Sequence, residues 1–439
     1  MSSDTAPAAS AVTLTGLSCL RCHTLYPPEQ RFDGCPRCRA QGVAVNLTCA
    51  YEYTLSGEPL RALFQSAQPS GLWRYAALLP VPRQHAVSLG EGGTPLLSCQ
   101  RLGARWGVPH LLLKDETGNP TWSYKDRLNA VVVAKAVEWA APAVVVSSTG
   151  NHGASTAAYA ARAGMPCIAL TIAAVPDTMK TLMQSYGASL VATQRSQDRW
   201  LVMRECVRQF GWVPTSNYMD PPIGSNPYGI EGYKTLAYEI CEQLGWTVPG
   251  TVVMPVAYGD GLFGAWKGFR ELHELGVVAS VPQMVAAEPV DRLNPALVQG
   301  LEVPAEVPAE PSPAFSIAGG YSTYQALLAL RQSGGYGTMA STDEIIAAQR
   351  DLARSEGIYV EASSATALAV VKKLAGMGRI APDCTVVAVL TSTGLKDPAA
   401  TARYLPPVPI IEPDLASLHA ALASTYAFHT PAAAVSRQG

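Results

Sequence analysis

Lys125 is the strongest candidate for covalent chemistry in this sequence. It lies in the segment Asn119-Pro-Thr-Trp-Ser-Tyr-Lys-Asp-Arg127, at the start of a predicted helix. A lysine forms an imine with an aldehyde only as a neutral amine, which burial and the positive end of a helix dipole both favour. We therefore predict that Lys125 forms a Schiff base with an aldehyde cofactor, although a lysine beside Asp and Arg is also typical of a solvated ion-pair surface.

A polar turn, Ser147-Ser-Thr-Gly-Asn-His-Gly153, follows the predicted strand at residues 143–147. Its backbone N–H groups would point at an anion such as a substrate α-carboxylate, and Asn151 can both donate to and accept from a ring hydroxyl. His152 could move a proton at neutral pH or cap the helix. The turn is also an ordinary composition for a helix N-cap, so the motif alone leaves both interpretations open.

A glycine-rich run, Gly259-Asp-Gly-Leu-Phe-Gly264, follows another predicted strand and opens a helix. It matches the G-x-G-x-x-G fingerprint of dinucleotide sites, and Glu288 lies near the place of the ribose-binding acid. The same backbone N–H groups would hold a phosphate monoester equally well. The run is not a Walker loop, because no Gly-Lys-Ser/Thr follows it.

Thr391 stands at the carboxyl end of the predicted strand at residues 385–390. A pyridine nitrogen that faces a hydroxyl instead of a carboxylate stays largely unprotonated. That state suits elimination and replacement better than transamination. A threonine at a strand end is otherwise unremarkable.

Four cysteines near the N-terminus have the spacing of metal ligands. Cys19 and Cys22 form one C-x2-C pair, and Cys35 and Cys38 form a second. Each pair directs two thiolates to one point, and four sulfurs complete a tetrahedral zinc site. A module this short has too little core to fold without a metal. The spacing therefore predicts a structural Zn2+ site in a zinc ribbon.

The elements that must position these residues follow a β-α-β pattern from about residue 49 onward. Apolar runs rich in Val and Ala alternate with longer amphipathic stretches, which is typical of a parallel sheet covered by helices on both faces. Ligands of such sheets bind outside the carboxyl ends of the strands, where the loops described above lie. Strands are predicted at residues 111–114, 143–147, 167–171, 251–256, 283–288 and 385–390, and a short helix around residues 415–424.

The predicted fold class is α/β, with two open parallel-sheet α/β domains and a small N-terminal zinc ribbon. Residues 1–15 are rich in small residues and predict a flexible tail. The other predicted segments are a zinc ribbon at residues 16–48, a connecting segment at 49–110, a smaller α/β domain at 111–225, a larger α/β domain at 226–405 and a C-terminal arm at 406–439.

The composition excludes several classes of protein. Hydrophobic residues make up 48% of the 439 residues and charged residues 15%, so the chain is not a disordered regulator. The formal net charge of −2 provides no basic surface for nucleic acid or for an anionic membrane. No apolar run reaches the roughly 18 residues of a membrane helix, and the N-terminus lacks the features of a signal peptide. We expect a cytoplasmic protein whose ten cysteines are thiols or metal ligands.

Taken in order, these motifs resemble the threonine synthase family of pyridoxal-phosphate enzymes, which have the tryptophan-synthase-β fold, also called fold type II. The resemblance spans nearly the whole chain, and it implies that the cofactor lies in the cleft between the two α/β domains. Further segments that carry it are Leu72-Trp-Arg-Tyr75, Gly90-Glu-Gly-Gly-Thr-Pro-Leu96, Gly268-Phe-Arg-Glu-Leu272, Glu361-Ala-Ser-Ser-Ala365 and Thr391-Ser-Thr-Gly-Leu-Lys-Asp-Pro398.

The resemblance implies a role for each cofactor residue. Lys125 would carry pyridoxal 5'-phosphate, Asn151 would contact its 3′-hydroxyl, and Thr391 would face its pyridine nitrogen. The glycine-rich loop would cradle its phosphate through Ala257, Tyr258, Gly259, Asp260 and Gly261. The G-x-G-x-x-G run is thereby assigned to a phosphate instead of a nicotinamide dinucleotide, provided that the Asp260 carboxylate turns away.

Departures from the family pattern cluster around the predicted substrate site. Trp122 stands where the family usually has glycine, Tyr124 replaces a phenylalanine and Leu128 replaces a glycine, so we expect a reshaped pocket. The candidate substrate-binding residues are Thr94, Trp122, Arg127, Ser148, Thr149 and His152.

The activity implied by the resemblance is that of a lyase, in which O-phospho-L-homoserine gives L-threonine and phosphate by elimination and replacement. Lys125 would be the base and acid at carbon. The alternatives are chemistry at the β-carbon, as in cysteate synthase or a threonine or serine dehydratase, and a cofactor-binding regulatory or scaffold protein without catalysis. The expected partners are a small amino-acid substrate and a second copy of the chain in a homodimer.

Overall fold

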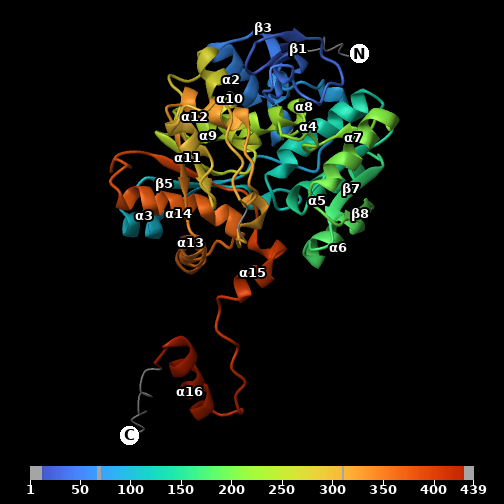
Figure 1. Cartoon of the computed structure of the whole chain (residues 1–439). Helices are drawn as coiled ribbons and strands as arrows, with labels where there is room; N and C mark the ends of the chain where they lie inside the picture. The colour runs from blue at the N-terminus through green and yellow to red at the C-terminus, as the bar shows by residue number, and fades with distance from the viewer. Residues whose placement is uncertain (1–11, 67–70, 309–310, 430–439) are drawn as a thin grey trace, which may run out of the picture. The chain divides into compact units, whose positions relative to one another are not determined.

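The computed structural model describes residues 12–66, 71–308 and 311–429. The chain divides into two compact units, Met1–Asp397 and Pro398–Gly439, so the second unit begins before the predicted arm at residue 406. All the parallel strands lie in the first unit, whose sheets are labelled in Figure 1.

The N-terminal segment forms a three-stranded antiparallel sheet in the order β2-β1-β3, with the short helix α1 between β2 and β3. Two predicted boundaries are wrong here, because β1 begins at Val12 and β3 continues to Tyr53, and these two residues pair across the sheet. Residues 1–11 of the predicted tail lie outside the described residues. The elements are β1 (Val12–Cys19), β2 (Leu25–Tyr26), α1 (Pro36–Arg39) and β3 (Leu47–Tyr53).

The larger of the two parallel sheets has six strands in the order β12-β11-β10-β13-β5-β4, of which only the edge strand β4 runs antiparallel to its neighbour. Its strands are β4 (Leu96–Ser98), β5 (Leu111–Asp115), β10 (Thr251–Pro255), β11 (Gln283–Glu288), β12 (Tyr336–Met339) and β13 (Val386–Leu390). The prediction that residues 111–225 form the smaller domain is wrong for β5, because β5 pairs with β13.

Both faces of this sheet are covered by helices, as its uninterrupted apolar strands require. Successive side chains point to opposite faces, so Val253 and Val285 pack with α3, α13 and α14, whereas Val252 and Met284 pack with α9, α10 and α12. These helices are α3 (Gln100–Trp106), α9 (Lys234–Gln243), α10 (Asp260–Glu274), α12 (Tyr324–Gln332), α13 (Thr342–Glu356) and α14 (Ala362–Gly376).

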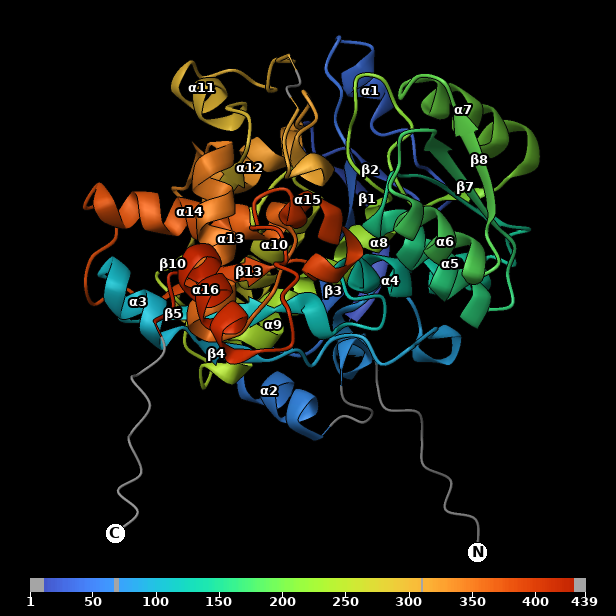
Figure 2. The same cartoon turned by 90° about the horizontal axis from the view of Figure 1, so that it is seen from below.

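The smaller parallel sheet has the order β8-β7-β6-β9 and lies apart from the larger sheet in both Figure 1 and Figure 2. Helix α4 is buried over most of its length, including its polar residues Asp126, Arg127 and Asn129, and it packs on α5 and on α8 (Pro227–Ile230). The elements are α4 (Lys125–Glu138), β6 (Val144–Ser147), α5 (Asn151–Arg162), β7 (Cys167–Ile172), α6 (Asp177–Ser185), β8 (Ser189–Thr193), α7 (Asp198–Phe210) and β9 (Val213–Pro214).

The predicted fold class is confirmed, and each of the six predicted strands is present to within one residue at either end. The helix expected around residues 415–424 is α16, none of whose residues is buried. The remaining helices are α2 (Gly57–Ser66), α8 (Pro227–Ile230), α11 (Leu293–Val298), α15 (Pro398–Ala402) and α16 (Leu415–Tyr426).

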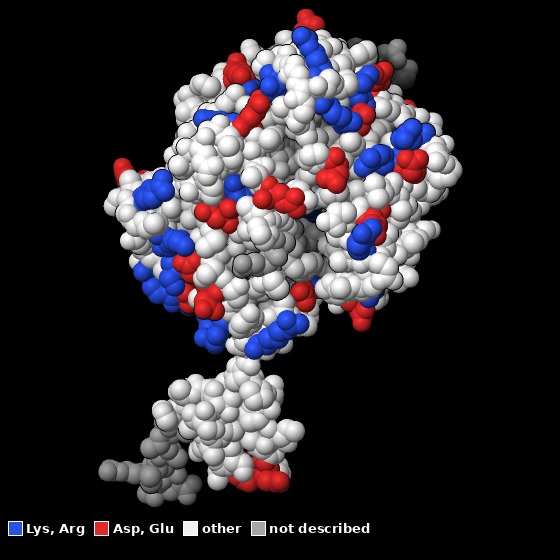
Figure 3. Space-filling model, in the orientation of Figure 1, with Lys and Arg blue, Asp and Glu red and all other residues white. Residues whose placement is uncertain are grey.

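In the described part of the chain, no helix combines the length and apolarity needed to cross a membrane. Acidic and basic side chains are intermixed over the face shown in Figure 3. That face therefore has no extended patch of positive charge of the kind that attracts nucleic acid.

Candidate active site

A cavity of about 380 Å3 opens where strands of both parallel sheets end. Helices α4, α5 and α10 begin at it, with Lys125, Asn151 and Asp260 as their first residues. Because α5 and α10 follow the carboxyl ends of β6 and β10, the cavity occupies the usual ligand position of an open parallel sheet. The N–H groups of a helix's first turn have no acceptor within the helix, so these three helix starts favour anionic ligands.

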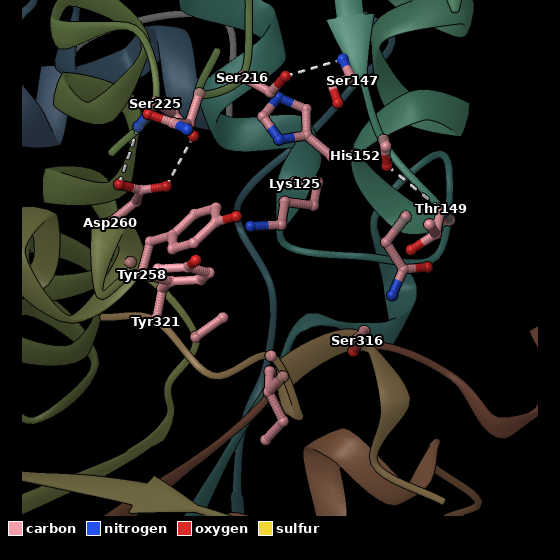
Figure 4. Close-up of a pocket in the computed structure, with 18 of the residues that line it drawn as sticks. Lys125, Ser147, Thr149, His152, Ser216, Ser225, Tyr258, Asp260, Ser316 and Tyr321 are labelled. Carbon is pink, nitrogen blue, oxygen red and sulfur yellow. Dashed lines mark hydrogen bonds between the residues drawn. The ribbon is translucent and has the colours of Figure 1, made fainter. Parts of the chain in front are cut away.

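Lys125 projects into the middle of this cavity, with His152 and Tyr258 on either side of it in Figure 4. Its Nζ lies 3.2 Å from the hydroxyl of Tyr233 and 3.4 Å from that of Tyr124. The two tyrosine rings stack with their centroids 4.9 Å apart, which fixes the hydroxyls in place. The amine is held by two tyrosine hydroxyls and has no carboxylate partner among the described residues, an arrangement that suits a reacting lysine better than an ion pair does.

The Asn151 amide is oriented by a charged group on each side. Its Nδ2 donates to both carboxylate oxygens of Glu361, at 3.0 and 3.2 Å, while its Oδ1 accepts from Nζ of Lys396 at 2.8 Å. Burial raises the pKa of Glu361 and lowers the pKa of Lys396 to about 8. Burial therefore disfavours the charged form of both flanking groups.

The turn after β6 presents its backbone to the cavity between Ser147 and Asn151. Ser148 Oγ accepts from the N–H of Gly150 at 3.2 Å, within the turn itself. Ser216, in the loop after β9, accepts through its Oγ from the N–H of Ser147 at 2.8 Å. Ser148 and Thr149 both line the cavity. These bonds hold the turn with its backbone at the cavity wall.

The His152 side chain is buried and lines the cavity, and its Nε2 has no hydrogen-bond partner among the described residues. Burial, followed by the positive charge of Lys125, lowers the pKa of His152 well below its ordinary value. The imidazole is therefore neutral at neutral pH. A neutral ring can still accept a proton or a hydrogen bond from a ligand.

The glycine-rich loop forms a tight cradle at the start of α10. Gly259 has a φ of +90°, and a Cβ on it would lie 2.4 Å from the Cβ of Ala326. A Cβ on Gly261 would lie 2.6 Å from the ring of Tyr124. Only glycine therefore allows this loop its conformation and its close packing on Ala326 and Tyr124. Ala257 and Tyr258 line the same loop.

The Asp260 carboxylate is held away from the loop's own N–H groups by partners of its own. It accepts from the backbone N–H and the hydroxyl of Ser225, at 3.0 and 2.6 Å, and from Nε2 of Gln325 at 2.5 Å. Figure 4 shows the two bonds to Ser225. The condition that this side chain turn aside from a bound phosphate is thus compatible with the structure.

Thr391 follows β13 and lines the cavity. Its Oγ1 lies 2.8 Å from Oγ of Ser364, and its carbonyl accepts from the N–H of Tyr124 at 3.0 Å. Ser364 thereby holds the hydroxyl, while the carbonyl joins this strand end to the residue that precedes Lys125. The structure brings this strand end together with the α4 start, although 266 residues separate Thr391 from Lys125.

Two candidate substrate residues, Thr94 and Arg127, do not line the cavity. Arg127 is fully buried and donates to Glu116 and Glu239, with its closest bonds at 2.7 Å. Thr94 bonds to the same two carboxylates. The expectation that Arg127 contacts the substrate is therefore not met, because its charge is consumed by a buried network that ties α4 to α9.

Trp122 is another candidate that does not line the cavity. It is 46% exposed. Its φ of +56° lies in the left-handed region, where glycine is favoured. Its carbonyl accepts from the Ser392 hydroxyl at 2.9 Å, which joins this turn to the loop after β13. The indole therefore does not reshape the cavity wall, whereas Tyr124 does line it.

The four N-terminal cysteines lie together. Their Sγ atoms all fall within 4.8 Å of one another, with Cys19 and Cys38 at 3.5 Å and Cys22 and Cys35 at 3.7 Å. Four thiolates around a tetrahedral zinc ion, with Zn–S bonds of about 2.3 Å, would be about 3.8 Å apart. The donor set and its spacing therefore fit zinc.

Residues 87–392 match the family model described as "Pyridoxal-phosphate dependent enzyme". The chain belongs to this family. The match includes every residue described above that lines the cavity, so the family and the site coincide.

Curated relatives extend the similarity to almost the full chain. The threonine synthase of Methanosarcina acetivorans is 36% identical over 389 residues, which cover 87% of this chain and 92% of that protein. The threonine synthase of Methanocaldococcus jannaschii is 35% identical over 402 residues, covering 88% and 94%. Together with the family match, these relatives identify a pyridoxal-phosphate-dependent lyase that acts on a small amino-acid substrate.

Solved structures with the same fold include maize serine racemase, with a TM-score of 0.60 and 20% identity, covering 71% of this chain and 91% of that one. A processed form of threonine deaminase isoform 2 from Solanum lycopersicum has a TM-score of 0.61 and 19% identity, covering 77% and 91%. At these identities the comparison concerns the fold alone.

The cavity fits pyridoxal phosphate on its own chemistry. The loop at Gly259 is packed so closely on Ala326 that no Cβ fits, and it leads into the N–H groups of a helix start, which suit a phosphate. Lys125 supplies an amine within the same cavity, and Thr391 supplies a neutral hydroxyl. A nicotinamide dinucleotide does not fit Glu288, because its carboxylate is occupied by Arg292 at 2.9 Å.

Sequence reasoning missed several residues that line the cavity. Arg199 and Tyr321 come from segments without a motif, and Glu361 was noted only as part of a matching segment. Tyr233, which bonds to Lys125, lies in a short helical turn before α9 and carries no local signal. Such residues reach the cavity only because segments far apart in the sequence pack together, which local sequence patterns do not reveal.

Proposed function

We propose that this lyase converts O-phospho-L-homoserine and water into L-threonine and inorganic phosphate. The observation that carries the proposal is the position of Lys125 between two tyrosine hydroxyls in a cavity that is also lined by the glycine-rich loop before α10 and by the turn after β6. Threonine synthases that match about nine-tenths of the chain support this choice of substrate over other amino acids.

Pyridoxal phosphate, when bound, would draw electrons away from the α-carbon of the substrate and so make its protons removable. Lys125 would hold the cofactor through Nζ and the 257–261 loop would hold its phosphate. Asn151 would contact its 3′-hydroxyl, and Thr391 would face its pyridine nitrogen.

Nζ of Lys125 is the group that moves protons in this proposal. Its position between the hydroxyls of Tyr124 and Tyr233 lets it exchange protons with both, while it takes protons from the substrate's carbon chain and returns them. The bond between the γ-carbon and the phosphate oxygen breaks, and the phosphate leaves with that oxygen. A water molecule then supplies a hydroxyl group to the β-carbon, and the γ-carbon gains a proton.

The turn between Ser147 and Asn151 would orient the substrate by its α-carboxylate. Ser148 and Thr149 present hydroxyl and backbone donors to the same space as Lys125. His152, whose pKa is lowered by burial, would remain neutral beside the substrate. This neutral ring avoids adding a second positive charge next to Lys125.

We also propose a structural zinc ion at Cys19, Cys22, Cys35 and Cys38. Their sulfur spacing fits a tetrahedral site, and the site lies between β1 and the start of α1. No position is open for a substrate when four thiolates bind the metal. The zinc would therefore stabilise the N-terminal sheet without taking part in the reaction.

The test is product identification with the purified, cofactor-loaded protein. Its substrates are O-phospho-L-homoserine, O-phospho-L-serine with and without sulfite, and free L-threonine. Threonine and phosphate from the homoserine ester alone support the proposal. A keto acid from threonine, or cysteate from the serine ester and sulfite, would instead assign chemistry at the β-carbon. No turnover of any substrate, despite bound cofactor, would favour a regulatory protein.

A further inference from the structure

Arg199 is a buried cation on the cavity wall whose guanidinium is only partly satisfied. It is the second residue of α7, and its side chain is 7% exposed. Nε donates to the Ser196 carbonyl at 3.0 Å and Nη2 to the Ser196 hydroxyl at 2.6 Å. Nη1 has no hydrogen-bond partner among the described residues, and the side chain lines the cavity.

Each of the other two arginines that are buried in the described ranges has a carboxylate partner, which Arg199 lacks. Arg127 pairs with Glu116 and Glu239, and Arg292 pairs with Glu288. Across the described ranges, Arg199 makes no ion pair with any carboxylate. Burial lowers the pKa of Arg199, but a guanidinium remains protonated, so its charge is buried without a counter-ion. A buried charge without a partner is costly, and a bound anion would supply the missing counter-ion.

The surroundings of Arg199 suit an anion that enters from outside. A second hollow adjoins the cavity and shares Ser196, Trp200, Tyr258 and Tyr321 with it. Arg199 therefore lies where the cavity meets an approach from the surface. The guanidinium and the Ser196 hydroxyl together offer the fork of donors that a phosphate group accepts.

Under the proposed function, three anionic groups must be accommodated in this cavity. The 257–261 loop would take the cofactor phosphate and the 147–151 turn the α-carboxylate, which leaves the side-chain phosphate of the substrate. We propose that Arg199, supported by Ser196, is the subsite for this phosphate monoester; this assignment of the ligand rests on the proposed function. The site determines specificity, because a free hydroxyl in place of the phosphate would leave the buried charge uncompensated.

The experiment compares Arg199→Gln and Arg199→Lys with Arg195→Gln. Arg195 lies in the same segment, but its side chain is 79% exposed and pairs with Asp198, so this variant is the matched control. Binding of radiolabelled inorganic phosphate to each holoenzyme is measured by equilibrium dialysis, alongside KM and kcat for O-phospho-L-homoserine. We expect Arg199→Gln to weaken phosphate binding and to raise KM at least about tenfold, the size of one lost charge-assisted hydrogen bond. Arg199→Lys should be intermediate, and Arg195→Gln unchanged.

Cofactor content and the melting temperature separate binding from a structural role. Arg199→Gln should retain its full cofactor content and melt no lower than wild type in the absence of phosphate, because it removes an uncompensated charge. Loss of cofactor, a lower melting temperature, or unchanged phosphate binding would each overturn the subsite. If phosphate binding depends on Arg199 and no threonine forms, the subsite stands and the proposed function fails. If threonine forms with an unchanged KM in Arg199→Gln, the reverse holds.

Discussion

Nζ of Lys125 lies 3.2 Å from the hydroxyl of Tyr233, a residue 108 positions away in the sequence. The Tyr233 ring stacks on that of Tyr124, so the neighbour of Lys125 and a distant residue fix the amine together. This contact makes the amine's place in the cavity independent of any ligand. Lys125 is the side chain whose removal should abolish covalent attachment of the cofactor.

Replacement of Lys125 by alanine should prevent covalent attachment of pyridoxal phosphate. Borohydride reduction followed by peptide mass spectrometry should find the cofactor on Lys125 in wild type and on no peptide of the variant. Turnover should fall by at least about a hundredfold, because proton transfer by a placed side chain contributes that much or more. Lys372→Ala, which changes an exposed lysine on α14, is the control and should behave as wild type. Attachment to a different lysine in wild type would contradict the assignment.

Replacement of His152 by asparagine should make the cofactor-free protein relatively more stable in acid. The folded pKa of His152 is lowered below 6.5, so the unfolded chain binds a proton first as the pH falls. Wild type should lose stability relative to the variant below pH 6.5, by up to about 1.4 kcal/mol per pH unit. Urea unfolding at several pH values measures this difference. A gap that stays constant with pH would mean that His152 is protonated in the folded protein as readily as in the unfolded chain.

Replacement of Arg127 by methionine should affect stability much more than substrate affinity. It leaves Glu116 buried without its counter-ion and leaves Glu239 with Lys114 alone, at a cost of about 3–5 kcal/mol. The control is Arg105→Met, whose side chain is 50% exposed and whose pair with Asp351 is worth no more than about 1 kcal/mol. Chemical denaturation gives the stabilities, and KM is measured on whatever protein folds. A raised KM at unchanged stability would restore Arg127 as a substrate contact.

Removal of the metal should loosen the N-terminal sheet. Wild-type protein should contain a single zinc ion per chain, and a strong chelator should lower its melting temperature. Cys38→Ser should lose the metal and show the lower melting temperature without chelator, since Cys38 belongs to the cluster. Cys206→Ser, which changes a cysteine outside the cluster, should retain zinc. The proposal fails if wild type contains no metal and Cys38→Ser melts at the same temperature.

The success of the strand predictions has a simple physical cause. Strands such as β10 and β13 are buried on both faces, so their sequences are unbroken apolar runs. The missed strands lack this signal: β8 is largely exposed, and β9 has only two residues. The placement of β5 was wrong because an apolar strand does not specify which of two neighbouring sheets it joins.

The cavity could be predicted only where a motif follows a strand. Asn151 and Gly259 follow β6 and β10 directly, so their place at the carboxyl edge was foreseeable. Arg127 was misplaced because its buried partner Glu239 is 112 residues away and sequence spacing gives no sign of it. The same limit applies to Arg199, whose burial and missing counter-ion depend on the packing of α7.

The fate of one oxygen atom tests the central claim most directly. The cofactor-loaded protein is given O-phospho-L-homoserine in water enriched in oxygen-18, and the products are analysed by mass spectrometry. Cleavage at carbon followed by addition of water predicts threonine with a labelled side-chain hydroxyl and phosphate that carries no label, in equal amounts. Labelled phosphate together with homoserine would show hydrolysis at phosphorus instead, and would contradict the proposed lyase reaction.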